Sequence, residues 1–72
     1  MNGRFNDVIK TSDGYVLVDT CETFDCGWET MVFKCNKTGK VTKWADLDCE
    51  RYPDREHAEL GHYEMVHKWL EK

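Results

Sequence analysis

The chain has 72 residues, a formal net charge of -4 and hydrophobic residues at 40% of its positions. This length fits a single domain, residues 1–72, near the lower limit at which an apolar core suffices without disulfides or metals. No long apolar run occurs, so the sequence predicts neither a signal peptide nor a membrane span. We therefore expect a cytoplasmic protein with reduced cysteines.

The charge is unevenly distributed along the chain. Residues 1–33 carry Arg4 and Lys10 against six acidic residues, and residues 44–72 carry four basic residues against eight acidic ones. Residues 34–43, in contrast, contain four lysines and no acidic residue. The sequence thus predicts an acidic body with one basic hairpin, and the acidic balance argues against general binding to phosphate backbones.

The first part of the chain predicts an antiparallel hairpin. Residues 7–11 and 15–20 have the composition of strands. Asp13-Gly14 between them is typical of a two-residue hairpin turn. Residues 24–27 then turn the chain toward the next strand.

The strongest strand signal lies at residues 28–35, where β-branched and aromatic side chains predominate. A turn signal at residues 36–39 leads into an expected strand at residues 40–44. Residues 45–52 predict an irregular link, with a short strand near residues 49–52.

Residues 53–72 predict one amphipathic helix. Asp54 is the expected N-cap, and Glu56 suits the positive end of the helix dipole. The apolar face of this helix consists of positions three or four residues apart. These positions are Ala58, Gly61, His62, Met65, Val66, Trp69 and Leu70.

The hairpin registers assign the strand residues to two faces, because directly opposed residues share a face. The face expected under the helix, with Gly61 allowing a close approach, carries Ile9, Val16, Val18, Met31, Phe33 and Cys35. The other face is expected to have no covering element and to carry Leu17, Asp19, Cys21, Trp28, Thr30, Val32 and Lys34. The sequence therefore predicts an α+β fold: a four-stranded antiparallel sheet with one C-terminal helix packed on one face, in the order β-β-β-β-α.

The cysteines and histidines predict neither a metal site nor a reaction. The gaps between the cysteines are mostly longer than the two to four residues that separate paired zinc ligands. Cys21 and Cys35 are expected on opposite faces, which excludes a bond between them, whereas Cys26 with Cys21 or with Cys49 stays open. A nucleophile pair of Cys35 and His62 would lie inside the main core without a substrate pocket. We expect no enzyme, no metal and no cofactor.

Several motifs resemble a known group of proteins. They are GWETMVF at residues 27–33, WADLD at 44–48, RY at 51–52, AELGH at 58–62 and MVHKW at 65–69. Over residues 8–69 the chain resembles small, largely uncharacterised proteins of phages and prophages of Gram-positive bacteria. The helix of that group usually begins with a run of glutamates, where this chain has DREH at residues 54–57.

The resemblance implies a phage accessory protein that works in the cytoplasm of the bacterial host. Small acidic phage proteins without an active site commonly bind and inhibit a larger host protein, as anti-CRISPR and other anti-defence inhibitors do. The resemblance carries no catalytic activity onto residues of this chain. We expect stoichiometric protein–protein binding.

The expected binding surface combines an apolar anchor with an acidic rim. Trp28 is the expected hot spot, with Leu17 and Val32 beside it on the uncovered sheet face. The acidic residues would steer association toward a host protein with a basic surface. These residues are Asp19, Glu22, Asp25 and Glu29. A second copy of the chain, in a homodimer, is an alternative partner for the same patch.

Two other functions stay open. One is a nucleic-acid-binding regulator that uses the basic hairpin of residues 34–43, with Phe24, Trp28 and Trp44 as stacking platforms. The acidic residues near these aromatics would repel phosphate, which disfavours this alternative. The other is a structural phage component.

Overall fold

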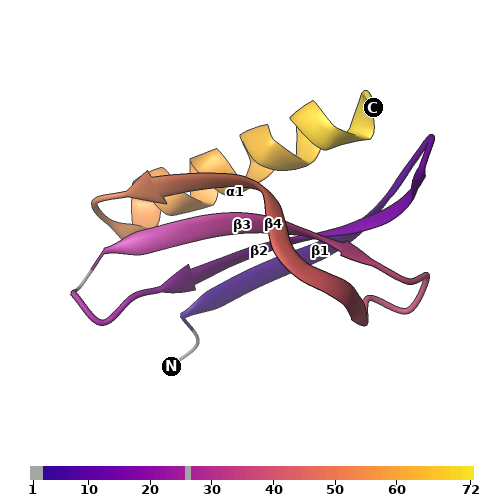
Figure 1. Cartoon of the computed structure of the whole chain (residues 1–72). Helices are drawn as coiled ribbons and strands as arrows, with labels where there is room; N and C mark the ends of the chain where they lie inside the picture. The colour runs from indigo at the N-terminus through magenta and orange to yellow at the C-terminus, as the bar shows by residue number, and fades with distance from the viewer. Residues whose placement is uncertain (1–2, 26) are drawn as a thin grey trace.

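The structure is a computed structural model that describes residues 3–25 and 27–72. Strands β1 (Arg4–Thr11), β2 (Gly14–Glu22), β3 (Trp28–Cys35) and β4 (Val41–Tyr52) form one antiparallel sheet in the order β1-β2-β3-β4. Helix α1 (Arg55–Leu70) follows and packs along one face of the twisted sheet (Figure 1). The predicted α+β fold is confirmed. The expected irregular link at residues 45–52 is wrong, because β4 continues through it.

The register between β2 and β3 differs by one residue from the register that the sequence predicted. Val18 lies opposite Val32, not opposite Phe33. The turn accounts for the difference, since the Thr23 N–H donates to the Gly27 carbonyl at 2.9 Å and thereby sets Thr23 opposite Gly27. A shift of one residue transfers every side chain of a strand to the other face.

This shift corrects the predicted faces of β3. Met31, Phe33 and Cys35 lie on the face away from the helix. Trp28 and Val32 lie beneath the helix, where they are only 5% and 0% exposed, so their predicted place on an uncovered face is wrong. The apolar core under the helix consists of Ile9, Val16, Val18, Val32 and Met65, with Val66 and Trp69 packed against it.

A buried polar network lies beside this core. The Thr20 hydroxyl lies 2.6 Å from both the Thr30 hydroxyl and His62 Nδ1, and His62 Nε2 lies 2.8 Å from a carboxylate oxygen of Asp7. Both threonines and His62 are almost completely buried. Because an unpaired buried polar group costs about 1–3 kcal/mol, the network stabilises the core only as a complete set of partners.

The helix begins and packs as the sequence predicted, apart from its last residue. Asp54 is the N-cap and accepts a hydrogen bond from the His57 N–H at 2.9 Å. This hydrogen bond is the main reason why the pKa of Asp54 lies below its ordinary value. At Gly61 the helix lies so close to β4 that an added Cβ would overlap the ring of Tyr52. Leu70, which was expected on the buried face, is half exposed.

We expect Gly61→Ala to lower the free energy of unfolding by about 1–3 kcal/mol through overpacking against Tyr52. Helix propensity alone would favour alanine by about 1 kcal/mol, so the sign of the change separates the two effects. Urea denaturation measures it. In a Tyr52→Ala background, the same substitution should become neutral or stabilising. A more stable Gly61→Ala variant in the native background would contradict the close contact.

The end of the helix is attached to β4 through Asp48, and this contact predicts a pH dependence. The Asp48 carboxylate accepts hydrogen bonds from Lys68 Nζ at 2.7 Å and from Trp69 Nε1 at 3.1 Å. Burial raises the pKa of Asp48, but these hydrogen bonds outweigh burial and hold the pKa below its ordinary value.

A carboxylate with a lowered pKa stabilises the fold above its unfolded pKa of about 3.9, and this contribution is lost as the pH falls through the folded pKa. We expect Asp48→Asn to cost roughly 1–3 kcal/mol at pH 7. The difference from the unmodified protein should narrow below about pH 4. Thermal unfolding at a series of pH values measures this, and a constant difference would contradict the role of the Asp48 charge.

Candidate functional site

The sheet face opposite the helix is partly covered by the chain itself. Between β3 and β4 the paired residues step from Val32 and Asp48 to Lys34 and Lys43, so β4 carries three more residues than β3 in this interval. The extra length bends the start of β4 and the preceding turn over the sheet. We call residues 36–44 the arch. The expectation that this face has no covering element is corrected.

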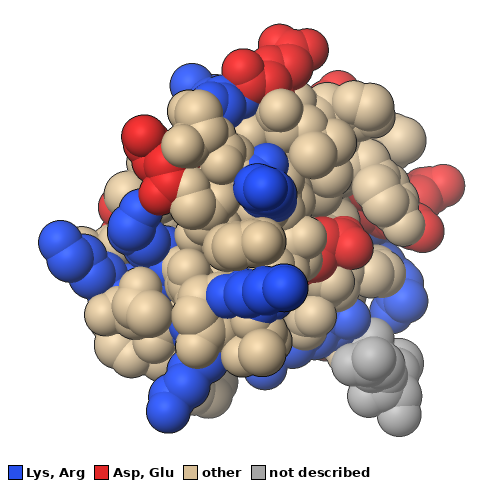
Figure 2. All heavy atoms as spheres, turned by 90° about the vertical axis from the view of Figure 1, so that its right-hand side faces the viewer, with Lys and Arg blue, Asp and Glu red and all other residues tan. Residues whose placement is uncertain are grey.

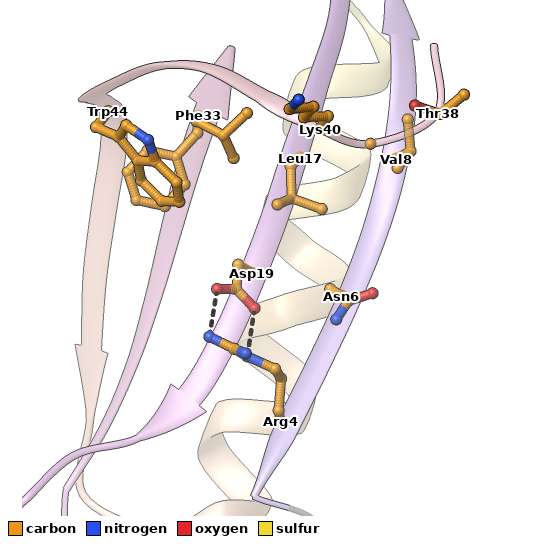
Figure 3. A pocket seen from close by; sticks show the side chains of 11 residues that line it. Arg4, Asn6, Val8, Leu17, Asp19, Phe33, Thr38, Lys40 and Trp44 are labelled. Carbon is orange, nitrogen blue, oxygen red and sulfur yellow. Dashed lines mark hydrogen bonds and ion pairs between the residues drawn. The ribbon is translucent and has the colours of Figure 1, made fainter. Parts of the chain in front are cut away.

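The tip of the arch reaches across β2 to β1. A Cβ added at Gly39 would lie 2.9 Å from a methyl group of Val8, so the two residues are in close contact. Gly39 has a positive φ of 91°, a conformation that other residues adopt only with strain. Figure 3 shows Thr38 beside Val8 and Lys40 beside Leu17.

A groove with a volume of about 510 Å³ lies between the arch and the sheet. Its apolar lining consists of Val8, Leu17, Phe33, Val41 and Trp44, and its polar lining includes Arg4, Asn6, Asp19, Thr38 and Lys40. Phe33 is buried at 7% exposure, whereas Trp44 is 75% exposed. The centroids of these two rings lie 5.3 Å apart in an edge-to-face arrangement (Figure 3). The groove therefore has an exposed indole held against a buried ring.

An ion pair lies at the open end of the groove. Arg4 Nε lies 3.1 Å from one oxygen of Asp19, and Arg4 Nη2 donates to the other oxygen at 3.2 Å. The Nε contact is close enough for an ion pair but is not aligned as a hydrogen bond, so the first oxygen keeps its acceptor capacity. Asp19 is thus neutralised by Arg4 (Figure 3).

Two further acidic residues of the expected rim are also paired. Asp25 and Glu29 contact the guanidinium of Arg51 at 3.3 Å and 3.7 Å. The Thr23 hydroxyl, with Arg51 as a smaller contribution, lowers the pKa of Asp25. Since the charge of Arg51 offsets one of these two negative charges, the acidic rim has less net charge than the sequence suggested.

Of the seven residues expected to bind a partner, the structure brings only Leu17 and Asp19 into the groove. Trp28 and Val32 lie under the helix, and the remaining three, Glu22, Asp25 and Glu29, do not line the groove. The interpretation of the sequence missed Val8, Phe33 and Lys40 as lining residues of a groove, and it treated Trp44 only as a base-stacking residue. The sequence signal that could have identified Trp44 was an aromatic residue next to a lysine-rich turn.

Six lysines gather at the end of the molecule that carries the arch. The end of β1, the end of β3, the start of β4 and the C-terminus meet there, and Figure 2 shows Lys and Arg side chains spread across this end with fewer Asp and Glu. Within residues 3–25 and 27–72, no ion pair joins any of these six lysines to a carboxylate. They are Lys10, Lys34, Lys37, Lys40, Lys43 and Lys72.

The described cysteines are free thiols. Cys21 and Cys35 share the groove face, which corrects the expected opposite faces, but six positions of register, about 20 Å, separate them along the strands. Burial raises the pKa of the Cys35 thiol, and burial together with Glu29 raises that of Cys49, so both stay protonated at neutral pH. Cys26 and its two open pairings lie outside the described residues.

The described residues contain no cluster of three His, Cys, Asp or Glu side chains arranged to hold a metal. The set Thr20, His62 and Asp7 contains a hydroxyl, an imidazole and a carboxylate, the groups that hydrolases combine. The Thr20 hydroxyl is completely buried, however, and a substrate has no access to it. Cys35 lies across the sheet from His62, so the two do not form a nucleophile pair.

No protein-family model, curated protein or solved structure matches the chain. Among the described residues, α1 does not combine the length and hydropathy that crossing a membrane would require.

Truncation of Trp28 in β3 and of Trp44 in β4 should change the free energy of unfolding by very different amounts. We expect Trp28→Ala to cost about 3–5 kcal/mol, because its ring is buried against Phe5 at a centroid distance of 5.9 Å. Trp44→Ala should change stability by about 0.5 kcal/mol or less, because its ring is mostly exposed. Urea denaturation of both variants checks this. Equal losses would contradict the observed register.

Proposed function

We propose that this protein binds a larger protein of a bacterial host stoichiometrically and inhibits it, using the groove as its contact surface. One observation carries the proposal: Trp44 is 75% exposed at an apolar groove and is held in place by a buried phenylalanine. Tryptophan is the residue most enriched among binding hot spots, and a preordered ring loses little conformational entropy on binding. An isolated monomer gains little from leaving such a ring in water.

The chemistry of the described residues favours binding over catalysis. The one combination of hydroxyl, imidazole and carboxylate is closed to solvent at Thr20. The Cys35 and Cys49 thiols have raised pKa values and are therefore weak nucleophiles. The sequence resemblance to small phage proteins supports an anti-defence role in the host cytoplasm as part of the same proposal.

The test is capture of the target by tagged protein from extracts of a host that carries a defined defence system, followed by binding kinetics on the purified target. We expect Trp44→Ala to weaken binding by about 2 kcal/mol or more, mainly through faster dissociation. Phe24→Ala is the matched control, because Phe24 is fully exposed at the turn between β2 and β3, which lies at the opposite end of the strands from the arch. In the same way, Trp44→Ala should no longer protect an infecting phage from the defence system, whereas Phe24→Ala should still protect it.

Equal capture by the Trp44→Ala and Phe24→Ala variants would contradict the groove as the binding surface. Equal phage protection by both variants would contradict inhibition through it.

A nucleic-acid-binding function is the second candidate, because six lysines lie at the end of the molecule that carries the arch, and the exposed indole of Trp44 on the arch can stack on a base. Binding to single-stranded and duplex DNA, titrated with salt, tests it. Micromolar binding with a steep salt dependence would favour this function, and its loss in Trp44→Ala would place the bases on the arch.

A further inference from the structure

We infer that the groove accepts an acidic segment of the partner protein, in which a large apolar side chain lies between carboxylates. This inference rests on the proposed function and adds the chemistry of the partner. It reverses the charge expected from the sequence, where the acidic residues indicated a basic partner.

The local charge at the groove is positive although the chain as a whole is negative. Two arginines offset part of the negative charge near the sheet face: Arg4 pairs with Asp19, and Arg51 is shared between Asp25 and Glu29. The six lysines have no such partners among the described residues. Charges that are already paired contribute little to long-range steering, so the unpaired lysines dominate the field at this end.

Two of these lysines are placed to contact a bound segment. Lys40 lines the groove itself. Arg4, Asn6 and Val8 of β1 line it as well, and since side chains alternate along a strand, Lys10 continues their row on the same face. Lys43 precedes Trp44 on the arch but pairs with Lys34, which lies on the helix side with Val16 and Trp69. The ammonium groups of Lys40 on the arch and Lys10 on β1 thus border the apolar lining.

The lining between these lysines selects for an apolar side chain. Val8 and Leu17 supply aliphatic surface from the sheet, and Phe33 with Trp44 supplies aromatic surface from the other side (Figure 3). Val8 and Trp44 are partly or mostly exposed, so covering them removes apolar surface from water. A partner that supplied only carboxylates would leave this apolar surface exposed to water.

A nucleic acid suits the groove less well than a peptide. The aliphatic residues Val8 and Leu17 line much of the groove and provide no aromatic surface on which bases could stack. A second copy of the chain is another acidic occupant, because the exposed Leu60 and Tyr63 of α1 lie among Glu56, Glu59 and Glu64. Binding measurements separate these occupants from the inferred one.

The probe is a fluorescein-labelled synthetic peptide with a Leu-Phe pair between short runs of Asp and Glu, and fluorescence anisotropy measures its binding. Matched probes carry Lys and Arg in place of the acidic residues, or Ser-Gly in place of Leu-Phe. Oligo(dT) is the nucleic-acid probe. We expect the acidic apolar peptide to bind about tenfold or more tightly than each of these three, and added salt to weaken it.

Variants of the protein locate the site. Lys40→Glu and Trp44→Ala should each weaken binding of the acidic peptide by about tenfold or more. Lys72→Glu is the matched control, because it makes the same change in net charge near Trp69, on the helix side. We expect it to weaken binding by about threefold or less.

Four results would overturn the inference. They are no binding of the acidic peptide, tighter binding of the basic peptide or of oligo(dT), equal effects of Lys40→Glu and Lys72→Glu, and a salt-sensitive self-association that Lys40→Glu abolishes. If Trp44→Ala still prevents capture of the host target while Lys40→Glu strengthens that capture, the proposed function stands and only the acidic nature of the partner is wrong. If Trp44→Ala captures the target normally, the proposed function itself fails.

Discussion

The pairing of Thr20 with Thr30 beneath His62 is the constraint on which the rest of the molecule depends. Two hydroxyls face each other inside the core, and they need a further partner that an apolar helix face would not supply. His62 provides it from the helix, and Asp7 of β1 binds the second ring nitrogen. This one network joins β1, β2, β3 and α1. It is complete only in the register that the turn after Thr23 sets, and it fixes the position of the helix on the sheet.

Once that register holds, the apolar residues of β3 divide between two faces. Val32 enters the core under the helix, and Phe33 points to the opposite side. A ring of this size would be costly to leave in water, and the bend of β4 brings the arch over it. The small domain therefore has two apolar clusters, one beneath the helix and one beneath the arch, with Trp44 at the edge of the second.

The fold also separates the charges in a way that composition does not reveal. Arg4 and Arg51 lie within reach of carboxylates and form ion pairs, whereas six of the seven lysines gather at one end, where no ion pair joins them to a carboxylate of the described residues. Exposed ion pairs of this kind contribute little to stability. Their main consequence is that the surface potential near the groove is governed by the lysines, so a chain with a net charge of -4 has a basic surface beside the groove.

Local signals in the sequence are enough to predict the number and order of the elements. Strand composition, the Asp13-Gly14 turn, the Asp54 N-cap and the spacing of the helix face are local signals, and each acts over a few residues. Gly61 was also identifiable, because a glycine on a buried helix face indicates a close approach to a neighbouring element.

The buried face of β3 and the position of the groove depend instead on long-range geometry. Alternation in β3 fits either face, since Met31, Phe33 and Cys35 are as apolar as Trp28, Thr30 and Val32, and a single residue in the turn after Thr23 decides between them. The arch depends on extra residues in β4 that have no pattern of their own, and on a contact between Gly39 and Val8 that are distant in sequence. The partners of the charged residues depend on the same long-range geometry, because an ion pair is set by distance in space and not by spacing along the chain.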